Sequence, residues 1–187
     1  MDAEVSPLWL KGLCIKPGAQ IALQSLLRQI EGIEAEIKIL DQAVEQLAEG
    51  ERYKAVAGAL VRKVKGVGLL TAMVYVTELG DLSRFNNRKQ VGSYWGLVPS
   101  SNESGEVADH KGHITREGSA RVRKVLCQAT WARVAHDKEE AVVYQRIVKK
   151  NPKHKKIAVV ASMRRLGVLL WHIGLAAQKE AVKEQAA

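Results

Sequence analysis

The chain has 187 residues, which is room for one ordinary domain and an appendage. With 47% hydrophobic and 26% charged residues, its composition is that of a globular protein and excludes an intrinsically disordered chain. Two cysteines, Cys14 and Cys127, are too few for a disulfide framework and fit a reducing cytosol. The first residues include Asp2 and Glu4 and no basic stretch, which argues against a signal peptide.

The net charge of +9 is unevenly distributed along the sequence. Residues 1–60 hold 6 Lys/Arg and 9 Asp/Glu, a net of −3, whereas residues 61–187 hold 23 and 11, a net of +12. Clustered Lys and Arg attract phosphates by charge and by counterion release. The second segment is therefore a candidate nucleic-acid surface, although a basic surface also serves solubility alone.

Residues 17–60 are predicted to form a helical arm after a tail at 1–16. Pro17-Gly18 marks its start, and Gly50 lies where a stop is expected. Apolar residues recur at alternating steps of three and four, the a/d seam of a coiled coil, at Leu23, Leu26, Ile30, Ile33, Ile37, Leu40, Val44 and Leu47. So narrow a stripe needs a partner helix, which predicts a homo-oligomer through the arm. The alternative is a helix docked on the chain's own domain.

Residues 61–175 are predicted to form a compact helical domain that opens with a glycine turn. One helix is expected to end near Val64 and the next to run from Leu69 to Leu79, as in the second half of a helix-hairpin-helix element. Glycines let a backbone approach a ligand closely, and N–H groups at a helix start can hold a phosphate. The predicted nucleic-acid-binding residues here are Lys63, Lys65, Gly66 and Gly68. A plain helix–helix turn is the alternative.

The middle of the sequence holds the longest polar loop, Pro99–Gly112, after a short helix over Arg88–Gly96. A basic helix follows, with Ser119 in the position of its N-cap. Further nucleic-acid contacts are predicted at Lys111, Arg116, Arg121, Arg123 and Lys124.

The last third reads as core helices separated by one basic run. Trp131, Tyr144 and Trp171 lie in apolar helical patterns and are predicted to be core residues. Lys149–Lys156 is broken by Pro152 and is either a nucleic-acid contact or a solvated loop. The last helix is predicted over Ile157–Leu175, and the apolar stretch Leu166–Ala177 is too short for a membrane span and is typical of a core helix. Residues 176–187 are predicted to be a frayed tail. No stretch keeps the alternation of a strand, so the predicted fold class is all-α.

Several ordered blocks over roughly residues 20–175 resemble the C-terminal domain of insertion-sequence transposases of the one-ten type. The first blocks are Lys65-Gly66-Val67-Gly68, Glu78-Leu79-Gly80-Asp81 and Arg84-Phe85. The later blocks are Gly92–Pro99, Ser104-Gly105, Gly112–Gly118 and Val122–Leu126. The resemblance implies a recombinase acting in DNA transposition, with DNA and a structured guide RNA as partners, in the bacterial cytoplasm at the nucleoid.

The resemblance also implies a catalytic role for Ser104, with Ser100 and Ser101 as rival positions. In the family, a serine of this domain attacks DNA in a site shared with metal-binding acids of an N-terminal DEDD nuclease-like domain. A loop hydroxyl needs neighbouring cations or a metal to act as a nucleophile on phosphorus.

The nuclease-like domain has no counterpart in this sequence, because the residues before Pro17 are too few for its sheet. No metal site is therefore expected in this chain, and magnesium belongs to the complete family site. The expectation is a C-terminal portion that binds DNA and lacks catalysis alone. The alternative is a non-enzymatic helix-hairpin-helix DNA-binding module with a self-association arm.

Overall fold

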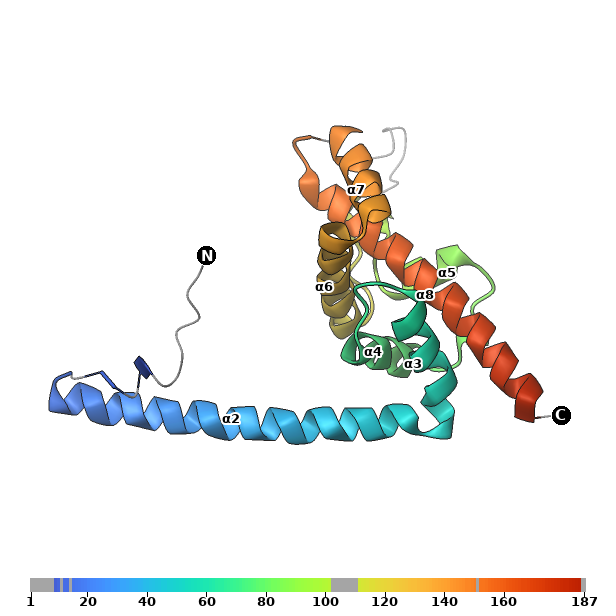
Figure 1. Ribbon diagram of the computed structural model, residues 1–187. Coiled ribbons are helices and arrows are strands. Elements are labelled where there is room, and N and C mark those ends of the chain that lie inside the picture. Colours follow the sequence, from blue (N-terminus) through green and yellow to red (C-terminus); the bar gives the residue numbers. More distant parts are fainter. Residues whose placement is uncertain (1–8, 11, 14, 102–110, 151, 186–187) are drawn as a thin grey trace. The chain divides into compact units, whose positions relative to one another are not determined.

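The computed structural model describes residues 9–10, 12–13, 15–101, 111–150 and 152–185 (Figure 1). It divides into two units, residues 1–46 and 47–187. Two residues singled out from the sequence, Cys14 and Ser104, lie outside the described residues. Almost all described residues in regular structure are helical, which confirms the all-α fold class.

The first unit is dominated by the long helix α2, Pro17–Glu49, of 33 residues. The helix begins at the Pro-Gly pair and ends before Gly50, as the sequence predicted. Large apolar side chains of the seam are exposed to solvent along it, at Leu26, Ile30, Ile33, Ile37 and Leu40. The helix therefore presents an apolar face along its length.

The second unit begins with α3 (Glu51–Lys63) and α4 (Leu69–Leu79), followed by the short 3-10 helix η1 (Leu82–Arg84) and α5 (Arg88–Tyr94). Two short strands, β1 (Pro99–Ser101) and β2 (Lys111–Ile114), pair antiparallel, with Pro99 opposite Ile114. Three helices complete the unit: α6 (Ala120–His136), α7 (Lys138–Lys150) and α8 (Lys155–Gln185).

Helix α8 is the central element of the second unit and contacts α3, α5, α6, α7 and η1 (Figure 1). By length and composition alone it would be long enough to cross a membrane. Its apolar residues instead line the core, where Ala158, Met163, Leu166, Leu170 and Trp171 are buried. The predicted core helix is confirmed, but it begins two residues earlier than Ile157 and continues through the predicted frayed tail to Gln185.

Trp95 occupies the middle of this core and is fully buried. Its ring lies 5.3 Å from that of Tyr75, whose hydroxyl donates a hydrogen bond to the Gly167 carbonyl of α8 at 2.7 Å. Burial raises the pKa of Tyr75 well above its usual value. Gly167 allows this packing, because a side chain there would overlap the Trp95 ring. The core thus fixes the turn that follows α5.

Three expectations from the sequence need correction or adjustment. The ends of the polar loop pair as strands, which are too short to show any alternation. Trp171 and Tyr144 are buried as predicted, whereas Trp131 is 47% exposed because the buried face of α6 runs through Val122, Val125, Leu126, Ala129 and Thr130. Finally, α3 belongs to the second unit, although the predicted arm extended to residue 60.

Candidate nucleic-acid interface

Two backbone turns next to the strand pair, around residues 94–96 and 116–118, are joined by hydrogen bonds. The amide of Arg116 donates to the Gly96 carbonyl at 3.2 Å, and that of Thr115 donates to the Val98 carbonyl at 3.0 Å. Gly96 and Gly118 have φ angles of +62° and +126°, which favour glycine, and Arg116 adopts the unusual value of +58°. The turns are so close that a Cβ on Gly118 would overlap the Tyr94 carbonyl. The segments around residues 94–96 and 116–118 are therefore held rigidly against each other.

Side chains of four residues surround this junction, and we call them the Tyr94 cluster: Glu78, Arg84, Tyr94 and Arg121. The Arg84 guanidinium lies 4.5 Å from the Tyr94 ring centre and 4.6 Å from that of Phe85. The Tyr94 hydroxyl donates to the Glu78 carbonyl at 3.2 Å, and the Glu78 carboxylate pairs with Arg121 at 3.1 Å. Cation–π contacts with two rings hold the Arg84 side chain in place while leaving it exposed.

The structure brings three predicted nucleic-acid residues, Arg116, Arg121 and Arg123, to this junction. Arg123 bonds inward, donating to the carbonyls of Trp95 at 3.2 Å and Gly118 at 2.9 Å. Lys124 is exposed one turn after Arg121, beyond the Ser119 N-cap, which accepts from the Val122 amide as predicted. Arg123 thus stabilises the junction, while the other side chains face solvent.

The polar loop that contains Ser104 connects to the same junction through the strand pair. Ser100, a rival to Ser104 for the catalytic role, donates a hydrogen bond from its hydroxyl to the His113 carbonyl across the pair at 3.0 Å. Lys111 begins β2, and Ser101 ends β1. Ser104 lies outside the described residues, between the two strands in sequence.

The remaining predicted residues, Lys63, Lys65, Gly66 and Gly68, lie at the turn between α3 and α4. Gly66, with φ +79°, approaches Arg133 of α6, so that an added Cβ would lie 3.1 Å from the Arg133 backbone nitrogen. Nothing lies within 4 Å of such an atom at Gly68, the N-cap of α4. Close packing against α6 therefore explains why position 66 is a glycine. The space beside Gly68 is free of protein atoms, so a ligand could approach its backbone.

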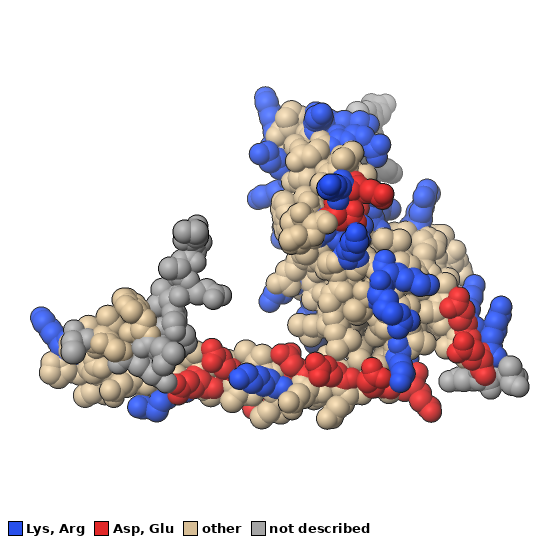
Figure 2. All heavy atoms as spheres, in the orientation of Figure 1, with Lys and Arg blue, Asp and Glu red and all other residues tan. Residues whose placement is uncertain are grey.

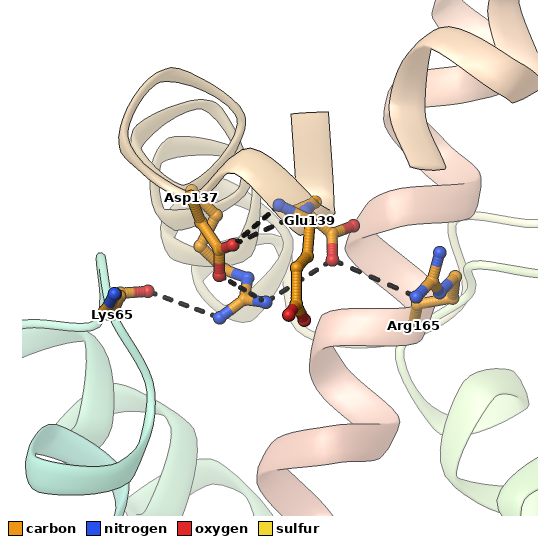
Figure 3. A network of polar contacts seen from close by, with 6 residues as sticks. Lys65, Asp137, Glu139 and Arg165 are labelled. Atoms are coloured by element: carbon orange, nitrogen blue, oxygen red, sulfur yellow. Dashed lines mark hydrogen bonds and ion pairs between the residues drawn. The ribbon is translucent and has the colours of Figure 1, made fainter. Parts of the chain in front are cut away.

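Arg133 joins this turn to three helices through a network of polar contacts (Figure 3). Its guanidinium donates to the Lys65 carbonyl at 3.4 Å and pairs with Asp137 and Glu140, each at 3.4 Å. Glu140 also faces Arg165 of α8 at 3.9 Å. Because Arg133 and Glu140 are largely buried and satisfied by protein groups, the network holds the turn and is not an open binding site.

The predicted contacts therefore fall into two groups at opposite ends of α6. Arg121 and Arg133 are twelve positions apart, about 18 Å along the helix axis. Arg84 is the site residue that the sequence reasoning missed. The only signal for Arg84 in the sequence is its place in the Arg84-Phe85 block of the family resemblance. The neighbouring sequence does not indicate that the Tyr94 ring lies against it.

Two acidic residues near the junction, Glu78 and Asp81, are engaged by the protein itself. Asp81 accepts hydrogen bonds from Gln178 and from Ser83, and these bonds lower its pKa. Among the described residues, no group of three or more His, Cys, Asp or Glu side chains could hold a metal ion.

Comparisons with known proteins agree with the resemblance. Residues 58–145 match the model of the transposase IS116/IS110/IS902 family. A putative transposase, y4rJ of Sinorhizobium fredii, is 34% identical over 155 residues, which cover 80% of this chain and 38% of that protein. A second putative transposase of the same organism, y4qE, is 33% identical over 115 residues, or 62% of this chain and 26% of that protein.

The transposase for insertion sequence element IS1111A of Coxiella burnetii is 33% identical over 95 residues, 48% of this chain and 26% of that protein. The chain thus spans between 26% and 38% of the length of these three curated relatives. The matched region, residues 58–145, contains the glycine turn, the Tyr94 cluster and the strand pair. Residues 58–145 therefore form a domain of the IS116/IS110/IS902 transposase family.

Proposed function

We propose that this chain is the DNA-binding portion of an insertion-sequence transposase and acts in DNA transposition. The observation that carries the proposal is the Tyr94 cluster, which lies within the family region and presents Arg84 and Arg121 to solvent. The Arg121 side chain is 84% exposed, so its ion pair with Glu78 is weak and can be exchanged for a phosphate. Contacts of this kind position DNA without reading its sequence.

Arg84 is the proposed anchor of this interface. A free arginine side chain loses rotamer entropy when it binds a phosphate. Contact with the rings of both Phe85 and Tyr94 removes part of that freedom in advance. The guanidinium can then offer paired N–H donors to phosphate oxygens at a lower entropic cost.

Arg84→Ala is expected to weaken binding of a labelled DNA duplex about three- to tenfold and to lower the salt slope by about one. The matched control is Arg52→Ala, since Arg52 is also exposed and stacks on a ring, that of Tyr53, at 5.3 Å. Fluorescence anisotropy over a salt series measures both quantities. Equal losses in the two variants would contradict the assignment, and no salt-dependent DNA binding by the wild-type chain would refute the proposed function.

Within this function, Ser104 is the proposed nucleophile of strand cleavage. Its hydroxyl oxygen would bond to phosphorus while one strand oxygen leaves, the serine losing its proton and the leaving oxygen gaining one. Lys111, Arg116 and Arg121 follow the loop and supply positive charge for the phosphate. The hydrogen bond of Ser100 to His113 supports Ser104 over this rival, because the Ser100 hydroxyl is already committed.

A serine–DNA adduct is expected when the chain is combined with a family nuclease-like domain that supplies magnesium ligands. The adduct should vanish, by at least about 100-fold, in Ser104→Ala and persist in Ser100→Ala and Ser101→Ala. Denaturing gel electrophoresis with labelled DNA detects it. An adduct that survives in Ser104→Ala and disappears in one of the other two variants would move the role to that serine.

Further parts of the proposal concern partners and place. A guide RNA is a proposed second nucleic-acid partner, and the bacterial cytoplasm, at the nucleoid, is the proposed location. The exposed seam of α2 favours assembly through residues 17–60 with a second copy of the chain. The same seam supports the second candidate, a non-enzymatic DNA-binding module that self-associates, which the adduct experiment separates from the first.

A further inference from the structure

The end of the second unit where α7 stops and α8 begins carries a concentration of positive charge. Between Glu140 and Glu180 the sequence has no acidic residue. Six basic residues gather around the α7–α8 connection, and we call them the α7–α8 tip: Arg146, Lys149, Lys150, Lys153, Lys155 and Lys156. All six are exposed, and Figure 2 shows Lys and Arg side chains gathered at this end of the molecule.

The charge at the tip is not neutralised within the described part of the chain. The ion pairs among the described residues involve Lys54, Arg121, Arg133 and Arg165. None of them includes one of the six tip residues. Glu140 has its partners in Arg133 and Arg165 and lies near the opposite end of α7, about 13 Å from Lys149 along the axis. The tip is therefore a surface of one sign.

Helix electrostatics account for only part of this charge. Lys149 and Lys150 lie in the last turn of α7, where the helix dipole favours cations. Lys155 and Lys156 lie in the first turn of α8, which contains no acidic residue, and there the dipole disfavours cations. These two lysines thus reduce stability where they stand, and a partner with negative charge would reverse that effect.

Apolar side chains adjoin the basic residues of the tip on the side of α7. A shallow depression of about 380 Å³ on α7 is lined by Ala141, Val142, Gln145, Arg146 and Lys149. Val142, at its edge, is 68% exposed. The lining includes the tip residues Arg146 and Lys149, so a phosphate backbone bound here would meet both cations and apolar side chains.

We propose that the α7–α8 tip is a second DNA-contact surface, which binds the phosphate backbone of a duplex and acts independently of the Tyr94 cluster. The inference rests on the proposed function, because it assigns a further part of the same DNA to this chain. Binding is expected to be sequence-independent and strongly dependent on salt.

The double variant Lys155→Glu/Lys156→Glu tests the tip in the full chain. It should weaken binding of a labelled DNA duplex about tenfold and lower the salt slope by about two, since two phosphate contacts are lost. The melting temperature should rise, because glutamates favour the start of α8. A purely structural role of the lysines would not move affinity and stability in opposite directions.

The matched control is Lys179→Glu/Lys183→Glu, which changes the net charge equally at exposed positions near the other end of the same helix. It should lower affinity less than about twofold. Equal losses in the two double variants would overturn the tip and leave the Arg84 result intact, whereas failure of the wild-type chain to bind DNA would overturn the proposed function. Loss of binding to a folded RNA alone, with duplex binding unchanged, would also overturn the assignment to DNA.

Discussion

Replacing Gly118 by alanine is expected to destabilise the second unit by about 4 kcal/mol, the sum of backbone strain and overpacking. The φ angle of Gly118 is +126°, in a region that other residues rarely adopt, and the new Cβ would overlap the Tyr94 carbonyl. The neighbouring turn cannot move away, because the Arg116 amide and Gly96 carbonyl hold it at 3.2 Å and Trp95 anchors it in the core. Tryptophan fluorescence during urea unfolding measures the loss.

Two control variants separate strain from overlap. Gly80 also has a positive φ, +65°, but no atom lies within 4 Å of an added Cβ, so Gly80→Ala should cost only the backbone strain, about 1–3 kcal/mol. Gly68 has a negative φ of −84° and open space, so Gly68→Ala should cost less than about 1 kcal/mol, the loss expected at an N-cap. If Gly118→Ala unfolds at no lower urea concentration than Gly80→Ala, the turns around residues 94–96 and 116–118 are not rigidly held together.

Helix positions could be predicted because their signals are local. Pro17 and Gly50 bracket α2, and Gly68 and Gly80 bracket α4, and each of these boundaries is a single residue that disfavours helix continuation. The seam of α2 was equally readable, since a period of 3.5 appears within one element. The all-α class followed from the same patterns, and only the strand pair, of three and four residues, was too short to leave a signal.

The arrangement of the candidate site could not be predicted, because it depends on contacts between distant segments. Gly66 was read as a point of approach for a ligand, yet its neighbour is Arg133, which comes from the far end of α6. Arg123 was read as a phosphate contact, yet it satisfies the carbonyls of Trp95 and Gly118. A sequence shows that a residue is charged or small, but which partner it meets is decided by packing.

The contacts of the arm cannot be predicted from the sequence either, because its partner would be a second copy of the chain. In α2, Ile37 and Ile39 are similarly exposed, at 50% and 59%. Only Ile37 belongs to the a/d seam, whereas Ile39 falls between seam positions. A coiled-coil dimer would bury Ile37 of both copies and leave Ile39 in water.

Ile37→Asp is therefore expected to raise the dissociation constant of the dimer at least about 100-fold. Two buried isoleucines contribute about 3–6 kcal/mol together, and each 1.4 kcal/mol corresponds to a factor of ten. Ile39→Asp is the matched control, since it makes the same change in charge and helix propensity and should shift the constant less than about threefold. Sedimentation equilibrium of the full chain measures both. A wild-type chain that stays monomeric at high micromolar concentration, or equal effects of the two substitutions, would show that the seam of α2 does not join two copies.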